Sequence, residues 1–506
     1  MFYFLSFFWF LREVRTLFFW IYLWQLKEYH WGRFIDHFRT EKGKKLFWNP
    51  VFVIKILLLF YASFLGLSKL LLPWHFYVNW IFILSFIYFL ESLKGLKEIF
   101  QDTLKRPVLT QKTSVLISLL LAVNFLFLYI LFQTFYFVSF QNLYWFAFYF
   151  LIFDISAPVI TTIVVFLIHP LSVIFFRNPL IKKAKKKREK MKNLLVIGIT
   201  GSFGKTSTKD FLAAILSEKF KVLKTKEHQN SEVGISSCIL NELKENHEIF
   251  VVEMGAYNKG GIKFLSDIVK PKIGIVTGIN EQHLATFGSM ENLLSAEGGK
   301  ELIDSLPGDG VVFLNGRNKY CLGLYEKTKI KKKLYGENIK LAGLENIEGA
   351  KLVAEEFGMT EEEIKKSLEK IENQFPGIEI KKNKAGLNII QATYSANPDG
   401  VISHLDYLKT FSGRKIIVMP CLIELGNASG EVHCKIGEKI SEVCDLAIIT
   451  TKDKFNEIQE KTGNKAIFMD DPKEIFEKIK NFLKEEDNLL LEGRVPRRLM
   501  NLLGIG

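Results

Sequence analysis

The run GITGSFGKTST at 198–208 is the part of the sequence best suited to hold a phosphate. It follows a short apolar run at 194–197 and precedes a helix-like segment at 209–216. Glycines let backbone N–H groups approach an anion, and the first turn of the next helix adds a positive dipole. Lys205 is placed to reach a nucleotide's terminal phosphates, and Thr206 to coordinate Mg²⁺. The run therefore predicts an ATP site, although its glycine spacing departs from the strict Walker form.

Two further polar residues follow apolar runs that are typical of buried strands. Glu253 directly follows the run 249–252, and His283 lies in the segment after the run 273–276. A carboxylate at the carboxyl end of a strand beside the glycine loop is placed to hold Mg²⁺. Each residue taken alone also fits a plainer interpretation, a solvated strand-end charge for Glu253 and a loop histidine for His283.

Strand-like and helical stretches alternate over the second part of the chain, which predicts mostly parallel α/β sheets. The strand-like runs are 194–197, 249–252, 273–276 and 311–314, followed by 387–390, 415–419, 446–450, 466–469 and 488–491. The helical stretch 346–373 and the turn-prone Phe375-Pro-Gly377 separate the two series. We therefore expect a P-loop-type ATP-binding domain over 193–375 and a Rossmann-like domain over 376–506.

Residues 1–176 have a different composition, rich in Phe, Leu, Ile, Trp and Tyr. Four segments are long and apolar enough to cross about 30 Å of hydrocarbon; they are 51–72, 76–93, 113–137 and 143–175. The last contains Asp154 and Pro158, so we expect it to tilt or kink. The predicted fold class is a membrane α-helical region followed by the two α/β domains.

Residues 2–26 are also apolar, but Arg12, Glu13 and Arg15 lie in their middle. Charges are costly at the centre of a bilayer, so an interfacial amphipathic helix and a membrane span both remain open. The stretch does not resemble a cleavable signal peptide, because it has no short apolar core followed by a small-residue cleavage site.

Basic residues gather in the segments 27–45, 94–112 and 177–192, whereas the connections near 73–75 and 138–142 have none. Four spans place the three basic segments on one side of the membrane, which the positive-inside rule makes cytoplasmic. The net charge of +13 comes largely from such segments. We therefore interpret the third as a juxtamembrane linker facing anionic lipid, and expect no nucleic-acid partner.

Five motifs occur in the order in which they occur in the Mur ligases, the ATP-dependent amide ligases of peptidoglycan synthesis. They are TGSFGKTSTKD, VVEMGAYNKGGI, KPKIGIVTGINEQHLATFGS, LPGDGVVFLN and YSANPDG. The resemblance covers about 193–506 and is closest to the MurF branch, through EMGA, HLATFGS and Tyr-x-Ala-Asn-Pro. That branch joins D-alanyl-D-alanine to UDP-N-acetylmuramoyl-tripeptide. The resemblance implies that the substrate carboxylate becomes an acyl phosphate, which an amine then attacks. Together with the predicted spans, it implies a bacterial protein of the inner membrane whose ligase domains face the cytoplasm.

The resemblance also assigns roles to particular residues. Those that would bind ATP are Gly201, Ser202, Gly204, Lys205, Thr206, Ser207 and Asn280. Those that would face the substrate are Asn230, Ser231, Tyr394 and Asn397. Thr206 and Glu253 would hold one Mg²⁺ and His283 would help to hold a second.

Several positions depart from the family pattern. The family lysine that works in carbamylated form falls at Gly299, with Lys300 one residue later, about 100° further around a helix. Two adjacent glycines favour an irregular helix, so Lys300 remains a catalytic candidate beside Lys205, Glu253 and His283. Other family residues are replaced at Gly349, Ile378, Gln391, Ala392 and 491–494.

Three hypotheses follow. The first is an active membrane-anchored ligase, with either a UDP-linked or a lipid-linked muramoyl peptide as acyl substrate and a dipeptide or amino acid as amine. Membrane spans occupy the place of the family's UDP-binding domain, which is why the lipid-linked substrate stays open. The second is a catalytically degenerate scaffold, favoured by the replaced residues. The third is a transporter or channel with a regulatory soluble part. The few charges within the spans, Lys55, Lys69 and Asp154, supply little for its polar pathway.

Overall fold

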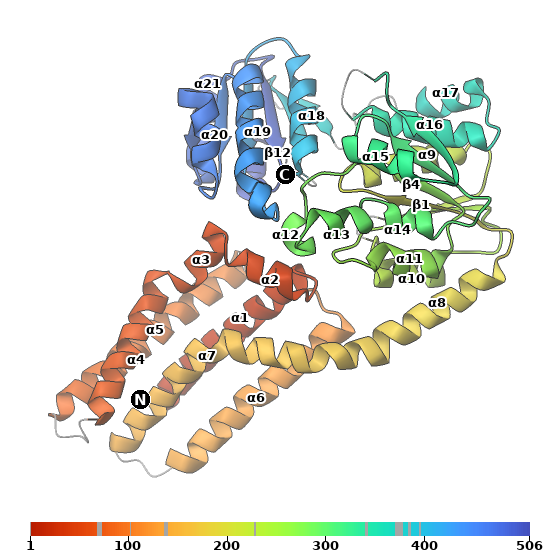
Figure 1. Cartoon of the computed structure of the whole chain (residues 1–506). Coiled ribbons are helices and arrows are strands. Elements are labelled where there is room, and N and C mark those ends of the chain that lie inside the picture. The colour runs from red at the N-terminus through yellow and green to blue at the C-terminus, as the bar shows by residue number, and fades with distance from the viewer. Residues whose placement is uncertain are drawn as a thin grey trace. The chain divides into compact units, whose positions relative to one another are not determined.

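The computed structural model describes residues 2–67, 73–101, 103–135, 140–226, 229–339, 343–369, 378–382, 386–393 and 396–505. The chain divides into two compact units, Met1–Arg177 and Asn178–Gly506 (Figure 1). In the described part of the first unit the regular secondary structure is helical, and the second unit contains two sheets covered by helices. The predicted fold class, apolar helices followed by α/β domains, is confirmed.

The N-terminal unit is a bundle of long apolar helices. Its elements are α1 Phe2–Leu26, α2 Trp31–His37, α3 Glu41–Phe47, α4 Pro50–Leu67, α5 Trp74–Phe100, α6 Gln111–Phe135 and α7 Phe140–Ser172, followed by a π-helical turn Val173–Arg177. Four described stretches are long and apolar enough to cross a membrane: Glu41–Leu67, Trp74–Phe100, Gln111–Phe135 and Asn142–Lys190. They correspond to the four expected spans; residues 68–72 and 136–137 of those spans, Lys69 among them, lie outside the described residues.

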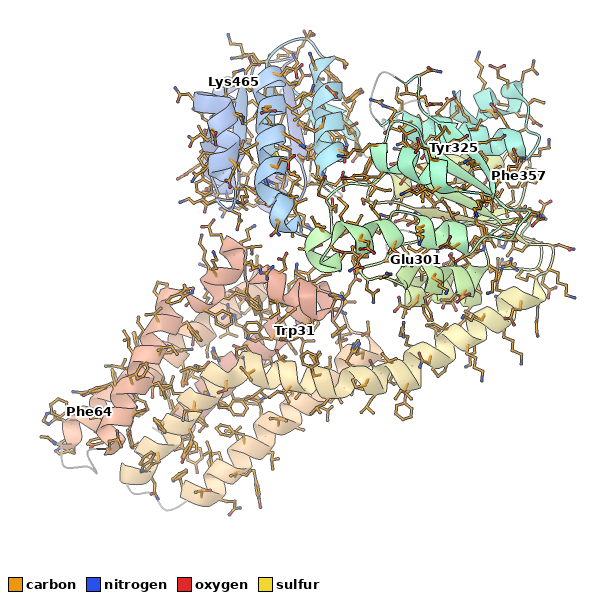
Figure 2. The ribbon with its side chains drawn as sticks, in the orientation of Figure 1. Trp31, Phe64, Glu301, Tyr325, Phe357 and Lys465 are labelled. Atoms are coloured by element: carbon orange, nitrogen blue, oxygen red, sulfur yellow. The ribbon has the colours of Figure 1, made fainter. Side chains whose placement is uncertain are left out.

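Helix α1 is a member of the bundle and packs against α5, α6 and α7. The Trp9 indole is fully buried and donates to the Phe150 carbonyl at 3.3 Å. Glu13 is 2% exposed, because its charge finds a partner within the bundle. Many outward-facing side chains of the long helices are apolar, such as Phe64 on α4, which is 60% exposed and labelled in Figure 2. An apolar outer surface around paired interior charges is what a lipid environment requires.

The basic run expected to be a linker forms helix α8, Asn178–Lys190, and packs on the second unit. Ile181 and Ala184 are buried. Lys187 donates to the Leu240 carbonyl at 3.0 Å, and Arg188 to the Val269 carbonyl at 2.8 Å. One face of the run therefore caps helices of the α/β unit, and only the rest of its charge faces solvent.

The first sheet is entirely parallel, in the order β2-β3-β1-β4-β5-β6. Its strands are β1 Leu195–Thr200, β2 Val222–Lys224, β3 Ile249–Glu253, β4 Ile273–Val276, β5 Val311–Asn315 and β6 Lys331–Tyr335. The sequence analysis missed the edge strands β2 and β6, because they are short or lysine-rich and only partly buried. Strand order reverses at β1, so the carboxyl ends of β1, β3 and β4 meet where ligands bind in such sheets.

Helices cover both faces of this sheet (Figure 1). They are α9 Lys205–Leu216, α16 Glu345–Glu356 and α17 Glu361–Glu369 on one face, and α10 Glu232–Asn241, α11 Gly261–Val269 and α14 Lys300–Asp304 on the other. Short helices α12 Leu284–Phe287, α13 Met290–Ser295 and α15 Lys319–Lys327 complete the domain. The predicted helical stretch 346–373 is two helices separated at Gly358, and its last four residues lie outside the described part.

The second sheet has the order β11-β10-β9-β12-β8-β7 and is parallel except for the β7–β8 pair. Its strands are β7 Glu379–Lys382, β8 Asn388–Ala392, β9 Lys415–Met419, β10 Leu446–Ile449, β11 Ala466–Phe468 and β12 Asn488–Glu492. Its helices are α18 Pro398–Lys409, α19 Ser429–Val443, α20 Phe455–Thr462, α21 Pro472–Phe482 and α22 Arg497–Leu502. Five of the six strands match the runs predicted from sequence.

Gly299 provides a test of how tightly the loop before α14 packs on β4. Its φ is +90°, and an added Cβ would lie 2.5 Å from Val276 Cγ2. Gly288 has φ +75° with open space around it. We expect Gly288→Ala to lower the free energy of unfolding by about 1 kcal/mol, because of its backbone conformation. Gly299→Ala should lower it by about 1–3 kcal/mol more, because the added Cβ also clashes with Val276. Thermal unfolding of the purified chain in detergent measures both; equal losses would show that β4 does not crowd this loop.

Candidate active site

The glycine loop at the carboxyl end of β1 is held in a conformation that only glycine adopts easily. Gly201 has φ +141°, and a Cβ there would lie 2.3 Å from Thr277 Oγ1. Gly204 has φ +77° and precedes the first residue of α9. The Ser202 backbone N–H donates to the Gly278 carbonyl at 2.7 Å, so the loop is tied to the end of β4. The buried Ser202 hydroxyl has no hydrogen-bond partner within the described part of the chain and is available to a phosphate oxygen.

Asn346 supports this loop from behind, and the sequence analysis did not single it out. A Cβ on Gly204 would lie 2.5 Å from Asn346 Oδ1, which accepts a hydrogen bond from Thr208 Oγ1 at 3.1 Å. Gly349, where the family pattern places an asparagine, instead lies against the Tyr335 ring. Asn346 lies far from the glycine loop in sequence and reaches it because the first turn of α16 packs against the loop.

Glu253 lies at the end of β3 and is the centre of a polar cluster. Its Oε2 accepts from Thr206 Oγ1 at 3.0 Å and from Lys209 Nζ at 3.2 Å, and its Oε1 accepts from Asn230 Nδ2 at 3.1 Å. Burial raises the pKa of Glu253, but Lys209, Lys205 and the Asn230 hydrogen bond outweigh burial and lower it overall. A hydroxyl and an ionised carboxylate in contact are ligands that Mg²⁺ accepts.

His283, Glu297 and Lys205 form a second cluster beside the glycine loop. Glu297 Oε2 lies 3.2 Å from His283 Nδ1, and its Oε1 lies 3.7 Å from Lys205 Nζ. Lys205 Nζ also donates to the Gly201 carbonyl. Glu297 is 1% exposed; burial raises its pKa, yet His283 and Lys205 lower it overall. The charge of Lys205 therefore interacts with both buried carboxylates, Glu297 and Glu253, and lowers the pKa of each.

Lys300, which the sequence analysis kept as a catalytic candidate, does not join these clusters. It is exposed at the first residue of α14, and within the described residues it makes no polar contact with the site. The left-handed turn at Gly299 directs the chain away after Glu297. The anionic group that reaches the site from this segment is Glu297, which the sequence analysis did not select.

The next residue, Glu301, has a structural role and is labelled in Figure 2. Its carboxylate accepts from the backbone N–H groups of Gly260 at 2.7 Å and Lys263 at 3.0 Å. These groups belong to the start of α11, where the helix dipole favours a negative charge. Glu301 therefore fixes the loop that follows Glu253 and Met254 to the segment that carries Glu297.

Residues from the second domain meet the loop that carries His283. Asn280 Nδ2 donates to Asn397 Oδ1 at 3.2 Å and to Asp399 Oδ2 at 2.6 Å. Asn397 also caps α18. Glu424 Oε2 lies 3.9 Å from His283 Nε2, and Glu424 lies on the loop after β9. Asp399 and Glu424 could not be found from local pattern, because only the association of the two domains brings them to His283 and Asn280.

The remaining predicted residues have mixed positions. Ser231 caps α10 by accepting from the Gly234 N–H at 3.3 Å, and Ser207 lies in the first turn of α9. Tyr394 lies outside the described residues. Ile378 is buried in the apolar core of the second domain, so it supplies no cation. Among the described residues, no three His, Cys, Asp or Glu side chains are grouped as a metal site.

Two protein-family models match the part of the sequence that forms the two α/β domains. Residues 199–385 match the Mur ligase middle domain, and residues 378–495 match the Mur ligase glutamate ligase domain. The two matches together run from 199 to 495, more than half of the 506 residues. The chain belongs to the Mur ligase family.

Individual relatives place the similarity within one branch of that family. UDP-N-acetylmuramoyl-tripeptide–D-alanyl-D-alanine ligase of Bacillus subtilis is 29% identical over 277 residues, 49% of this chain and 60% of that protein. The ligase of the same name from Escherichia coli is 26% identical over 283 residues, 48% of this chain and 61% of that protein. The chain thus spans about six tenths of the length of these relatives.

Solved structures support the fold. MurF from Acinetobacter baumannii has a TM-score of 0.58 at 24% identity, over 65% of this chain and 79% of that one. MurF from Thermotoga maritima, in complex with ADP, has a TM-score of 0.55 at 24% identity, over 65% of this chain and 83% of that one.

The lowered pKa of Glu297 predicts a pH-dependent contribution to stability. The folded state favours the carboxylate, so the stabilisation is present above the ordinary pKa of 4.5 and is lost as the pH falls below it. We expect Glu297→Gln to lower stability by about 1–3 kcal/mol near neutral pH, with the difference from wild type narrowing below pH 4.5. Thermal unfolding across pH measures this. The exposed Glu326→Gln is the control, and a pH-independent difference would contradict the assignment.

Proposed function

We propose that this protein is a membrane-anchored, ATP-dependent ligase that forms an amide bond in a peptidoglycan precursor, in the manner of MurF. The observation that carries the proposal is the position of Lys205, which reaches from the glycine loop towards the buried carboxylates of Glu253 and Glu297. Family membership and the MurF relatives support the same reaction class.

In this proposal a substrate carboxylate oxygen attacks the γ-phosphorus of ATP and ADP leaves. The amine of the second substrate then attacks the acyl carbon, an amide bond forms, phosphate departs and the amine loses a proton. Both anions must approach each other, so cations at the meeting point lower the barrier. Lys205, the loop N–H groups and the Ser202 hydroxyl bind the phosphates. Mg²⁺ held by Thr206 and Glu253 would supply further positive charge.

We assign Glu297 the part that a carbamylated lysine has in the family pattern. A carbamylated lysine presents an anionic, carboxylate-like end on a long side chain, and Glu297 presents a carboxylate from a shorter one. Its contacts with His283 Nδ1 and Lys205 Nζ hold it in ionised form beside the phosphate loop. With Glu297 in this role, the lysine missing at position 299 does not remove the second anionic group from the site.

The substrates follow from the same branch: UDP-muramoyl-tripeptide with D-alanyl-D-alanine, or a lipid-linked muramoyl peptide with a dipeptide or amino acid as amine. In this proposal the four apolar stretches cross the bacterial inner membrane and the ligase domains lie on its cytoplasmic side; the length and apolar composition of the stretches support the first part and the basic connections the second. The bilayer is then its principal partner besides its substrates.

A catalytically degenerate scaffold remains the second candidate, because Ile378 is buried in the core where the family pattern has an arginine. In that case the site would hold nucleotide weakly and Lys205 would be dispensable. The transporter hypothesis is not favoured, because the charges inside the described spans pair with one another.

Release of phosphate from ATP separates these candidates. With Mg²⁺, UDP-muramoyl-tripeptide and D-alanyl-D-alanine, we expect the full chain to release phosphate only when both substrates are present. Lys205→Ala should reduce the rate by at least about 100-fold, since it removes a cation from the transferred phosphate. The matched control Lys300→Ala should stay within about twofold, because Lys300 is exposed outside the site. No turnover and no ATP binding would support the scaffold; equal losses in both variants would restore Lys300 as catalytic.

A further inference from the structure

The N-terminal unit contains a cavity of about 560 Å³ that the ligase function does not use. Its walls come from α1, the end of α3, the start of α4, the second half of α5, the connection after α5, and α7. The lining combines ionised side chains with apolar ones; the aromatic members are Phe19, Trp20, Phe47 and Phe52. A cavity of this size and mixed lining can hold a small amphiphilic group.

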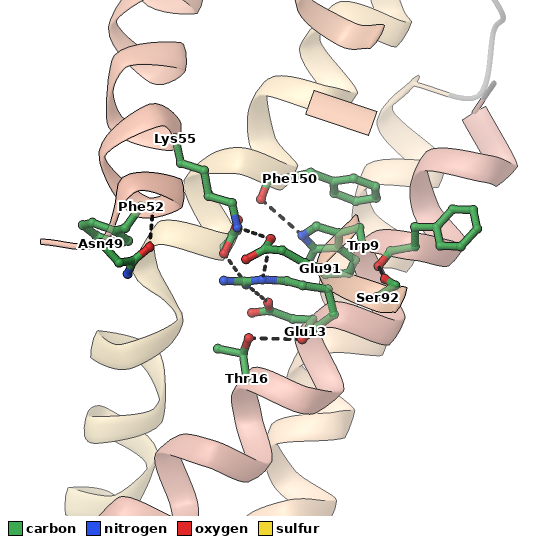
Figure 3. Close-up of polar contacts among 12 residues, drawn as sticks. Trp9, Glu13, Thr16, Asn49, Phe52, Lys55, Glu91, Ser92 and Phe150 are labelled. Atoms are coloured by element: carbon green, nitrogen blue, oxygen red, sulfur yellow. Dashed lines mark hydrogen bonds and ion pairs between the residues drawn. The ribbon is translucent and has the colours of Figure 1, made fainter. Parts of the chain in front are cut away.

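The floor of the cavity is a buried network of charges (Figure 3). Lys55 Nζ lies 2.5 Å from Glu91 Oε2 and 2.8 Å from Asp154 Oδ2. Arg12 pairs with Asp154, lies 3.4 Å from Glu91, and donates to Glu13 at 2.6 Å. Lys55 and Asp154 are 1% and 3% exposed. Both cations of the floor, Lys55 and Arg12, have carboxylate partners, so the network holds the helices together. An anionic ligand would therefore have to be bound by other cations of the lining.

The rim of the cavity, which includes Lys94 and Lys105, carries positive charge that the carboxylates of the floor do not neutralise. The lining holds six cations, Arg12, Arg15, Lys45, Lys55, Lys94 and Lys105, against three carboxylates, Glu91, Glu98 and Asp154. Arg15 is held by Glu98 through two hydrogen bonds of 2.8 and 2.7 Å. Lys94 and Lys105 are exposed, and neither pairs with a carboxylate among the described residues. Arg12 also pairs with Glu13, and Lys45 pairs with Glu41. The positive charge of the lining that is left without a carboxylate partner among the described residues is therefore that of Lys94 and Lys105.

The cavity lies at the end of the bundle where the basic connections gather. Lys45 and Phe47 belong to α3, directly before the span helix α4, and Lys105 belongs to the connection between α5 and α6. Positively charged segments beside a span lie at the depth of the anionic headgroups of the cytoplasmic leaflet. In a bound lipid, the cations would contact the charged headgroup and the neighbouring aromatic side chains would contact the start of the acyl chains.

We propose that this cavity binds the phosphate headgroup of an anionic membrane lipid. Lys94 and Lys105 contact the phosphate, Arg15 supports it from the wall, and the lipid chain leaves along the face formed by Phe19, Trp20 and Phe52. The site stands apart from ATP chemistry, since none of its lining residues belongs to the α/β unit. Its consequence is that the anchor selects a lipid with an anionic phosphate headgroup and does not merely cross the bilayer.

The test is binding of lipid to the delipidated full chain in detergent, measured by native mass spectrometry. The probes are dioleoyl phosphatidic acid, dioleoyl phosphatidylcholine and inorganic pyrophosphate. We expect phosphatidic acid to bind at one saturable site and phosphatidylcholine to bind much more weakly. The double variant Lys94→Gln/Lys105→Gln should raise the dissociation constant for phosphatidic acid by about tenfold or more.

The matched control is Lys42→Gln/Lys44→Gln, which removes the same charge from exposed lysines of α3 outside the cavity lining. We expect its dissociation constant to stay within about twofold of wild type, because it leaves the rim intact. Equal weakening in both variants would overturn the proposal in favour of general attraction to the basic surface. Pyrophosphate that binds as tightly and displaces the lipid would overturn the lipid assignment. Lys205→Ala should leave lipid binding unchanged, which separates this proposal from the proposed function.

Discussion

The α/β unit depends on one electrostatic arrangement: a lysine held near two carboxylates in an environment with little water. Buried carboxylates are costly unless charges and hydrogen bonds compensate them. Glu253 is compensated by Lys209, Thr206 and Asn230, and Glu297 by His283 and Lys205. The strand order reverses at β1, which brings these groups to one edge of the sheet, beside the glycine loop.

The same principle applies in the helical unit, with a different outcome. Arg12 and Glu13 interrupt an apolar helix, yet α1 packs inside the bundle because Glu91 and Asp154 lie opposite Arg12. Burial of a charge in lipid surroundings requires such partners. The network joins α1, α4, α5 and α7, so it fixes the register of these helices and shapes the cavity above it.

Features encoded in a contiguous segment could be predicted from sequence. The run from 194 to 216 contains strand, turn and helix together, so the loop, Lys205 and Thr206 follow from local pattern. Glu253 follows from its place at the end of an apolar strand. Glu297 could not be found this way, because its burial depends on the left-handed turn at Gly299. Residues that reach the site from distant segments, such as Asn346 and Glu424, also escaped, because only tertiary packing brings them there.

The most direct test of the account follows an oxygen atom. A muramoyl-tripeptide substrate labelled with ¹⁸O in its reacting carboxylate is turned over with ATP, Mg²⁺ and the amine, and the released phosphate is analysed by mass spectrometry. Attack of the carboxylate on the γ-phosphorus predicts one ¹⁸O atom in each released phosphate, because the amine displaces phosphate together with a carboxylate oxygen. Phosphate free of label, with all the ¹⁸O retained by the muramoyl peptide, would contradict the acyl-phosphate ligase.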